Sequence, residues 1–233
     1  MKYQVLAAAL VAGCAAISNA DVLWDQSQLG WAVPTGFPNV LAGNPNTYYT
    51  VADVNVTGAG WTVNSVSMYF SCFDFNWPET TTGRLNIFTQ SGALPSNSDN
   101  PASGGLVPGL VNMTVEILND PSNFDQAYYR VTASGLNINL AAGSYWIGLT
   151  PVAPSGFFGP ESGLPAANQI GAGSPFRSPF TGPGSPPANT WVNLNAPASY
   201  DAAILVQGVA LPTPGAAAIV GLGGLIAGRR RRA

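Results

Sequence analysis

The sequence predicts an all-β fold, an antiparallel β-sandwich of the jelly-roll kind, and two observations lead to this expectation. Apolar and polar residues alternate in several stretches of the middle of the chain, as they do in strands that bury one face. Turn-forming Gly, Pro, Asn and Ser residues separate these stretches, and none of them carries a convincing helical period. About eight to ten short strands of this kind fit two packed antiparallel sheets.

The expected strands follow one another from residue 52 to residue 209. Alternation places five of them at residues 52–56, 111–117, 129–133, 136–140 and 145–149, with a final strand at 202–209. In the second of these, Val111, Met113, Val115 and Ile117 face one way. The tight turn Ala142-Gly143-Ser144 predicts a hairpin between the strands on either side of it.

Residues 61–72 form a strand whose alternation changes phase. Trp61 and Val63 share one face, whereas the apolar residues from Val66 onward share the other. One extra residue near Asn64-Ser65 would restore a common buried face, so we expect a β-bulge or a break there. Cys72 ends the strand and is expected to be a small buried residue, because the chain has no histidine to activate its thiol.

Two loops stand out between the strands. Residues 94–108 are rich in Ser, Asn, Pro and Gly and are expected to end a hairpin. Residues 151–190 form a longer Pro- and Gly-rich loop, which we expect to wrap a face or edge of the sheet. Four aromatic rings would hold it there, those of Phe157, Phe158, Phe176 and Phe180.

The N-terminus has the pattern of a secretory signal peptide over residues 1–20. Met1-Lys2 supplies a positive charge, an apolar segment follows, and Ser18-Asn19-Ala20 gives a small-residue exit. We expect cleavage between Ala20 and Asp21. A second interpretation is that residues 11–14 form a lipobox, which would make Cys14 a lipid-modified N-terminus.

The C-terminus, residues 212–233, has three parts in a fixed order. Pro212, Thr213, Pro214 and Gly215 form a turn, an apolar run covers residues 215–228, and four arginines follow, Arg229, Arg230, Arg231 and Arg232. At about 1.5 Å per residue the run spans roughly 21 Å as a helix, short for a bilayer core of about 30 Å. We therefore expect a short transmembrane helix that holds the chain transiently in the inner membrane, with the arginines on the cytoplasmic side.

This tail resembles the PEP-CTERM sorting signal of exopolysaccharide-producing Gram-negative bacteria, with Thr213 where that family usually has Glu. The resemblance implies an exosortase-like processing enzyme as partner, removal of the tail near Pro214, and a surface or extracellular-matrix location. Residues 21–211 would then be the exported domain, and they loosely resemble the β-sandwich domains found upstream of such tails.

Composition narrows the functions open to this domain. All 11 acidic residues lie within it, against three remaining basic residues, Arg84, Arg130 and Arg177, so nucleic acid is not an expected partner. The lack of histidine removes Ser-His-Asp and Cys-His catalysis and histidine metal ligation. No cofactor is expected, because no P-loop or dinucleotide fingerprint occurs.

Two candidate sites remain, both near residues 73–79. Phe73, Asp74, Phe75 and Trp77 could form an aromatic platform for carbohydrate, although alternate rings also suit a buried strand face. Asp74 and Glu79 are the nearest acid pair for glycoside hydrolysis, although two solvated loop acids explain them better. Residues 97–100 could hold calcium, but ordinary turn chemistry is the favoured interpretation.

The sequence therefore predicts an exported, non-catalytic surface or matrix protein. A carbohydrate-binding module, with extracellular polysaccharide as its partner, is the first alternative. A glycoside hydrolase is the second.

Overall fold

A computed structural model describes residues 20–29, 49–72, 77–96, 98–101, 105–119, 127–152, 162–164, 166–170, 173–177, 189–193 and 201–213. Every named element in these residues is a β-strand, and every pair of named strands is antiparallel. The prediction of an all-β, antiparallel fold is therefore confirmed.

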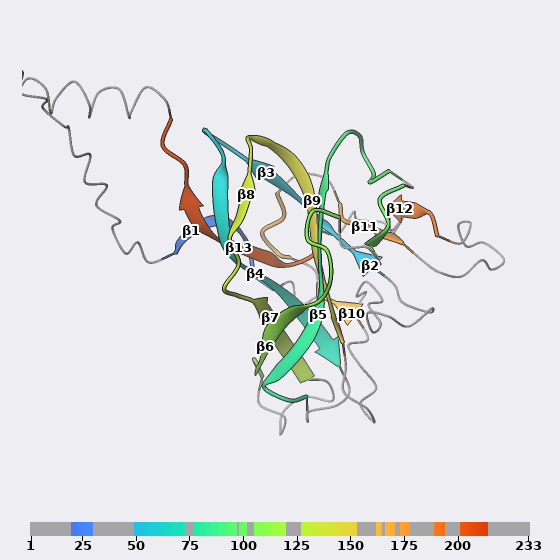
Figure 1. The fold of residues 1–233 in the computed structure, drawn as a ribbon. Helices are drawn as coiled ribbons and strands as arrows, with labels where there is room; N and C mark the ends of the chain where they lie inside the picture. The colour runs from blue at the N-terminus through green and yellow to red at the C-terminus, as the bar shows by residue number, and fades with distance from the viewer. Residues whose placement is uncertain are drawn as a thin grey trace, which may run out of the picture.

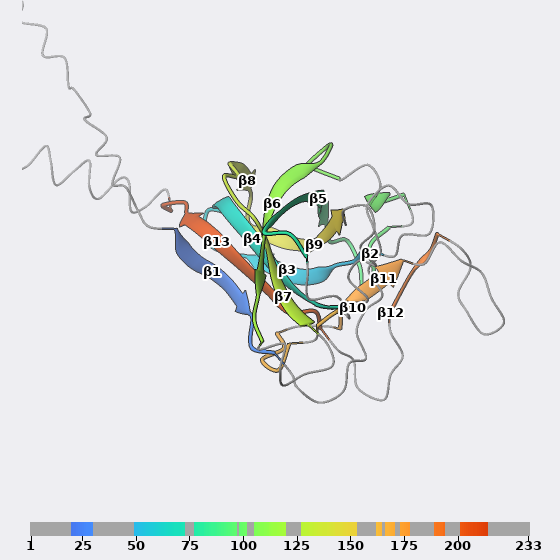
Figure 2. The ribbon, with the colours of Figure 1, turned by 90° about the horizontal axis from the view of Figure 1, so that it is seen from below.

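Ten strands form one large sheet that curls around the core (Figures 1 and 2). Its main path runs β1-β13-β4-β7-β6-β5-β9-β3, and β8 and β10 pair with β4 off this path. Its strands are β1 (Asp21–Gln26), β3 (Ala52–Val56), β4 (Trp61–Cys72), β5 (Thr80–Thr89), β6 (Val111–Ile117), β7 (Ala127–Ala133), β8 (Ile138–Leu140), β9 (Gly143–Val152), β10 (Ser162–Gly163) and β13 (Ile204–Ala210).

The core lies inside this curled sheet, between β4 and β9. Alternate residues of each strand point inward, and the largest fully buried side chains include Phe70, Met68, Ile147 and Leu149. The backbone N–H of Leu149 donates to the Met68 sulfur at 3.0 Å, so β9 and β4 face each other across the core. The fold is therefore held by apolar packing from strands distant in sequence.

A second, three-stranded sheet covers part of the outer surface of the first. It consists of β2 (Tyr49–Thr50), β11 (Pro175–Arg177) and β12 (Trp191–Asn193). Its Tyr49 and Trp191 pack with Phe88 of β5 and Trp146 of β9 in a separate apolar cluster. The strands β5 and β9 are consequently buried on both faces.

Alternation located several strands correctly. β3 and β6 lie at the residues predicted, β7 begins two residues earlier than predicted, and burial alternates along these strands. Ile117 shares the face of Met113 and Val115, as expected, but it is 42% exposed at the end of its strand. The final strand also lies where predicted, with Ala202 as an isolated bridge residue just before it.

The predicted bulge is present in β4. Gln207 of β13 pairs with Ser65, but the next residue, Gly208, pairs with Val63, which leaves Asn64 as the extra residue. The Asn64 carbonyl accepts a hydrogen bond from the Leu136 amide at 3.0 Å, so its backbone oxygen is satisfied outside the ladder. Cys72, at the end of β4, is fully buried as expected.

The predicted hairpin around Ala142-Gly143-Ser144 is wrong. β8 pairs with β4, whereas β9 pairs with β3 and β5. The turn therefore carries the chain from one side of the curled sheet to the other rather than back along the same strand (Figure 1). A short connection between alternating segments does not by itself distinguish these two geometries.

The long loop 151–190 contains short strands. β10 extends the sheet at the end of β4, and β11 joins β2 and β12 in the small sheet. The backbone of Phe176 pairs with Thr50 and Val192, while Phe157, Phe158 and Phe180 lie outside the described residues. Among the described parts of the loop, β10 thus extends the large sheet, whereas β11 is the central strand of the small sheet.

Both ends of the described fold leave it from the same place. β1 and β13 are antiparallel neighbours, with Asp21 opposite Gly208. The Leu211 amide then donates to the Gly60 carbonyl at 2.8 Å, which fixes the end of β13. Within the described residues, no helix is long and apolar enough to cross a bilayer. The expected signal helix and tail helix lie outside those residues.

Candidate functional site

Trp77 is a core residue and not part of an exposed platform. Its side chain is 6% exposed and packs edge-on against Tyr129 and Phe70, with ring centroids 5.3 and 6.5 Å away. This is the buried strand-face interpretation of the aromatic alternation. Phe73, Asp74 and Phe75 lie outside the described residues. The predicted acid pair of Asp74 and Glu79 is therefore described only for Glu79.

Glu79 lies at the surface just before β5. Its backbone carbonyl accepts a hydrogen bond from the Val115 amide at 2.6 Å, which ties the start of β5 to β6. Its side chain is exposed, as expected for a solvated acid.

The turn at residues 96–99 is closed by its own hydrogen bonds. The Asp99 carboxylate accepts from the Ser96 amide at 2.9 Å, and the Asp99 amide donates to the Ser96 carbonyl at 2.8 Å. The Asp99 carbonyl in turn accepts from Arg177 and Trp191 of the small sheet. Turn chemistry thus accounts for these polar groups. Among the described residues no three His, Cys, Asp or Glu side chains gather as a metal site.

The main buried ionisable group is Asp201, which lies just before β13 and is 1% exposed. Its two carboxylate oxygens accept hydrogen bonds from the Ser174 hydroxyl and the Gln26 amide. The Ser174 hydroxyl also accepts from the Ala202 amide at 2.8 Å, and Asp53 of β3 is a further neighbour of the carboxyl group. Asp201 therefore joins segments from four parts of the chain.

Burial raises the pKa of Asp201 to about 7, because a charged carboxylate is poorly solvated there. Hydrogen bonds from Ser174 and Gln26 lower this pKa, whereas the like charge of Asp53 raises it. A carboxyl group this deeply buried is out of reach of a substrate. We therefore assign it a structural role.

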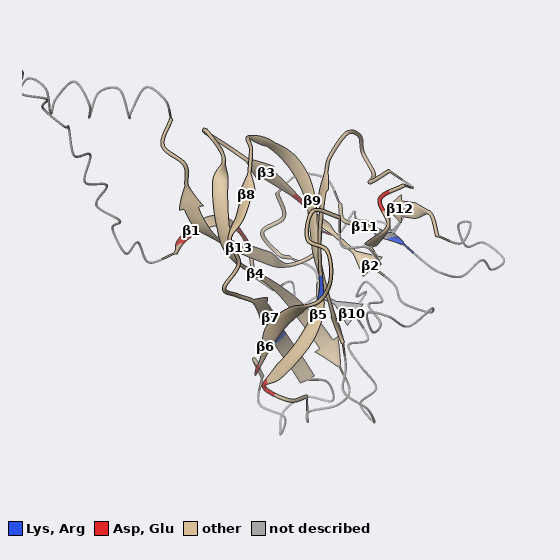
Figure 3. Ribbon diagram, in the orientation of Figure 1, with Lys and Arg blue, Asp and Glu red and all other residues tan. Residues whose placement is uncertain are grey.

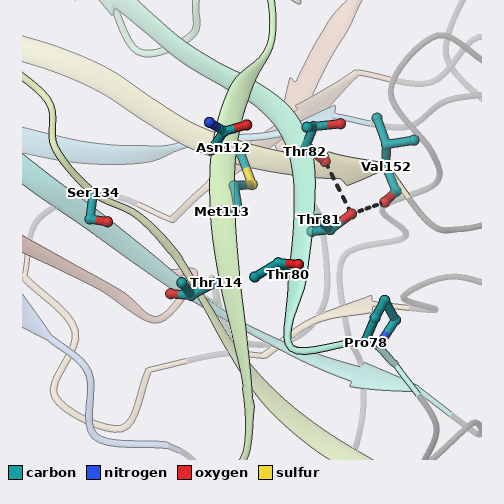
Figure 4. Close-up of a pocket in the computed structure, with 9 residues that line it drawn as sticks. All are labelled: Pro78, Thr80, Thr81, Thr82, Asn112, Met113, Thr114, Ser134 and Val152. Atoms are coloured by element: carbon teal, nitrogen blue, oxygen red, sulfur yellow. Dashed lines mark hydrogen bonds between the residues drawn. The ribbon is translucent and has the colours of Figure 1, made fainter.

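A hollow on the surface lies at the paired strands β5 and β6 (Figure 4). Its volume is about 670 Å³, within the range of small-molecule sites. Thr82 is paired with Asn112, and Thr80 with Thr114, so these side chains share the outer face. The lining residues are Pro78, Thr80, Thr81, Thr82, Asn112, Met113, Thr114, Ser134 and Val152.

Most polar side chains of this hollow are available to a ligand. Within the described chain, the side chains of Thr80, Thr82, Asn112 and Ser134 make no hydrogen bond, and all four are partly or fully exposed. Thr81 differs, since its hydroxyl donates to the Val152 carbonyl and so links β5 to the end of β9 (Figure 4). None of the lining residues is ionisable.

A second hollow of about 450 Å³ continues the first toward the end of β6. Thr80 and Thr114 line both hollows, and Glu79, Val115, Glu116 and Ile117 line only the second. Glu116 forms an ion pair with Arg130 of β7, both partly exposed. Figure 3 shows that charged residues are sparse along the described part of the chain. We call the two hollows together the β5–β6 groove.

Sequence reasoning did not find this groove. Its clearest signal is the run Thr80-Thr81-Thr82, which breaks the apolar alternation expected of a strand. The loop at residues 94–108 is expected to end a hairpin, but no alternation marks β5, so its register with β6, and hence the two facing polar rows, could not be inferred.

The predicted processing sites lie at the limits of the described fold. Ala20 and Asp21 are exposed at the start of β1, and Pro212 and Thr213 are exposed after β13. Pro214, Gly215 and the arginines 229–232 lie outside the described residues, as does Cys14. Comparisons of the chain with protein families, characterised proteins and solved structures give no significant match.

Proposed function

We propose that this chain is an exported, non-catalytic protein of the cell surface or extracellular matrix, sorted by an exosortase-type enzyme. The observation that carries the proposal is the agreement between fold and sequence signals. The first strand begins at Asp21, directly after the expected signal-peptide exit, and the last ends at Ala210, just before Pro212. Removal of both terminal segments would leave every named strand intact.

In this proposal residues 21–211, the body of the protein, form a jelly-roll-like sandwich between a signal helix and a short transmembrane helix. The antiparallel pairing of β1 with β13 supports it, because the two processing sites emerge at one end of the body. A body attached at one end can fold outside the inner membrane while the tail is still held there. The tail would be cut near Pro214 by the processing enzyme.

Mass spectrometry of the protein recovered from the cell surface and medium tests the proposal. We expect an N-terminus at Asp21 and a C-terminus near Pro214, without Arg229 to Arg232. An N-terminus at a lipid-modified Cys14 would support the lipobox interpretation instead. Mature surface protein that retains the four arginines would contradict sorting by tail removal.

A pair of variants separates recognition of the tail from general damage. Replacing Pro212 and Pro214 by Ala should leave the tail attached and keep the chain in the inner-membrane fraction. The matched control is Pro108→Ala, which changes an exposed proline in the loop between β5 and β6 and should be processed normally. Normal processing of the double variant would show that the processing enzyme does not recognise this motif.

A further inference from the structure

We propose that the β5–β6 groove binds a neutral polysaccharide chain. The inference goes beyond export and sorting, because it concerns the folded body and is independent of how the chain ends are processed. It also differs from an aromatic-platform site, since Trp77 is buried in the core.

The groove has the shape of a site for an extended ligand. Its two hollows share Thr80 and Thr114 and so lie next to each other along β6. From Asn112 to Ile117 the strand advances about 17 Å at roughly 3.3 Å per residue. Such a length suits several consecutive units of a polymer rather than a single small molecule.

The chemistry of the lining selects a neutral, hydroxyl-rich ligand. The first hollow offers hydroxyl and amide groups from Thr80, Thr82, Asn112 and Ser134, each able to donate and accept hydrogen bonds. Pro78 and Val152 add apolar surface beside them, which suits the C–H faces of sugar rings. A polyol matches this mixture of groups, whereas the first hollow offers no ionisable side chain to a charged ligand.

Charge around the groove disfavours acidic polymers. Glu79 and Glu116 line the second hollow, and Arg130 is already paired with Glu116. Arg84, two residues after Thr82 on β5, donates to the Gly109 carbonyl at 3.3 Å and lines neither hollow. A uronate or sulfate group placed there would meet a net negative environment. The groove should therefore distinguish neutral chains from acidic ones.

The binding groups are held in place before the ligand arrives. Thr80, Thr82 and Thr114 are β-branched, so their first side-chain torsions are restricted, and they stand on paired strands. Thr114 is paired with Thr132 of β7, and the Thr132 hydroxyl lies 2.8 Å from the Ser67 hydroxyl. Little side-chain entropy remains to be lost on binding, which favours affinity.

Affinity electrophoresis and calorimetry with the purified full chain, kept soluble in a zwitterionic detergent, test the proposal. The neutral probes are dextran, laminarin, galactomannan and xyloglucan, and the acidic probes are alginate and hyaluronate. We expect at least one neutral polymer to bind, and the acidic polymers to bind at least about tenfold more weakly. Lack of binding to all four neutral polymers, or equal binding of the acidic ones, would overturn the proposal.

The double variant Thr82→Val/Asn112→Val removes two facing polar groups at exposed or half-exposed strand positions. Valine suits a strand, so the fold should persist, which circular dichroism checks. We expect at least a tenfold loss of affinity. The control Thr89→Val, at an exposed position at the far end of β5, should bind like the unmodified chain. An unchanged affinity in the folded double variant would also reject the site, whatever the fate of the tail in cells.

Discussion

Asp201 lies where β1, β3, β13 and the segment before β11 meet. Its carboxyl group contacts Gln26, Asp53 and Ser174, which are far from one another along the chain. Its own backbone carbonyl accepts from the Ala166 amide at 2.8 Å. A single protonation event at this residue therefore acts on several segments at once. No local pattern marks the cluster, so the sequence could not have predicted it.

Because Asp201 stays protonated in the folded protein, we predict that the free energy of unfolding falls as the pH rises from about 4 to about 7. In the folded protein the pKa is about 7, whereas an unfolded aspartate has a pKa near 3.8, so the folded state keeps a proton that the unfolded state releases. The resulting loss in the free energy of unfolding is up to about 4 kcal/mol, complete once the pH exceeds the folded-state pKa. Urea unfolding of the full chain at pH 4, 5.5, 7 and 8 measures it.

The variant Asp53→Asn isolates the contribution of the neighbouring carboxylate. Without this like charge the pKa of Asp201 should fall, so the loss of stability between pH 4 and 7 should become smaller. The control Asp25→Asn changes an exposed acid of β1 and should leave the pH profile unchanged. Equal slopes for Asp53→Asn and the unmodified chain would show that the two carboxyl groups are not coupled.

At the scale of elements, burial on both faces explains why alternation misses β5 and finds only the middle of β9. β7 has one covered face, and its buried and half-buried residues alternate along its whole length. β5 and β9 lie between the main core and the small sheet, so polar and apolar residues are buried side by side, as Asn86 and Ile87 are. Burial on both faces weakens the two-residue period of such a strand, so its full length emerges only from the tertiary structure.

The bulge in β4 predicts that deletion of Asn64 is strongly destabilising. Without the extra residue, Trp61 and Val63 would turn to the outer face, and Thr62 would turn inward. Both apolar side chains are now almost fully buried, so the expected cost is about 4 kcal/mol or more. Thermal unfolding followed by far-ultraviolet circular dichroism measures it.

Deletion of Gly92 is the matched control for this experiment. Gly92 lies in the exposed turn after β5, and a side chain there would meet no atom closer than 4.0 Å. This deletion should shift the midpoint of thermal unfolding only slightly. Similar losses from the two deletions would indicate that chain length, and not the phase of β4, sets the stability.

At the scale of the whole molecule, the sheet curls until its edge strands β1 and β3 lie near one another. β1 and β3 are the two ends of the strand path and are not paired with each other. Gln26 of β1 and Asp53 of β3 both contact Asp201, so side chains connect these two edges. The sequence predicted the all-β fold class and the bulge. It could not predict the groove, because no alternation marks β5 and the groove depends on the register of β5 with β6.

The pairing of β1 with β13 predicts that a disulfide can join the two ends of the body. Val22 and Gln207 are opposite each other, and residues so placed have Cα atoms about 4.5–5.5 Å apart, within disulfide range. The variant Val22→Cys/Gln207→Cys should therefore crosslink during export, while the buried Cys72 does not compete. Closing so long a loop should raise the free energy of unfolding by up to about 5 kcal/mol, and non-reducing electrophoresis with thermal unfolding checks both effects.

The control Val22→Cys/Leu205→Cys is out of register, because Leu205 pairs with Asp25, and should stay reduced. If the out-of-register pair crosslinked as efficiently, the edge of the sheet would not hold the register that places Asp21 opposite Gly208.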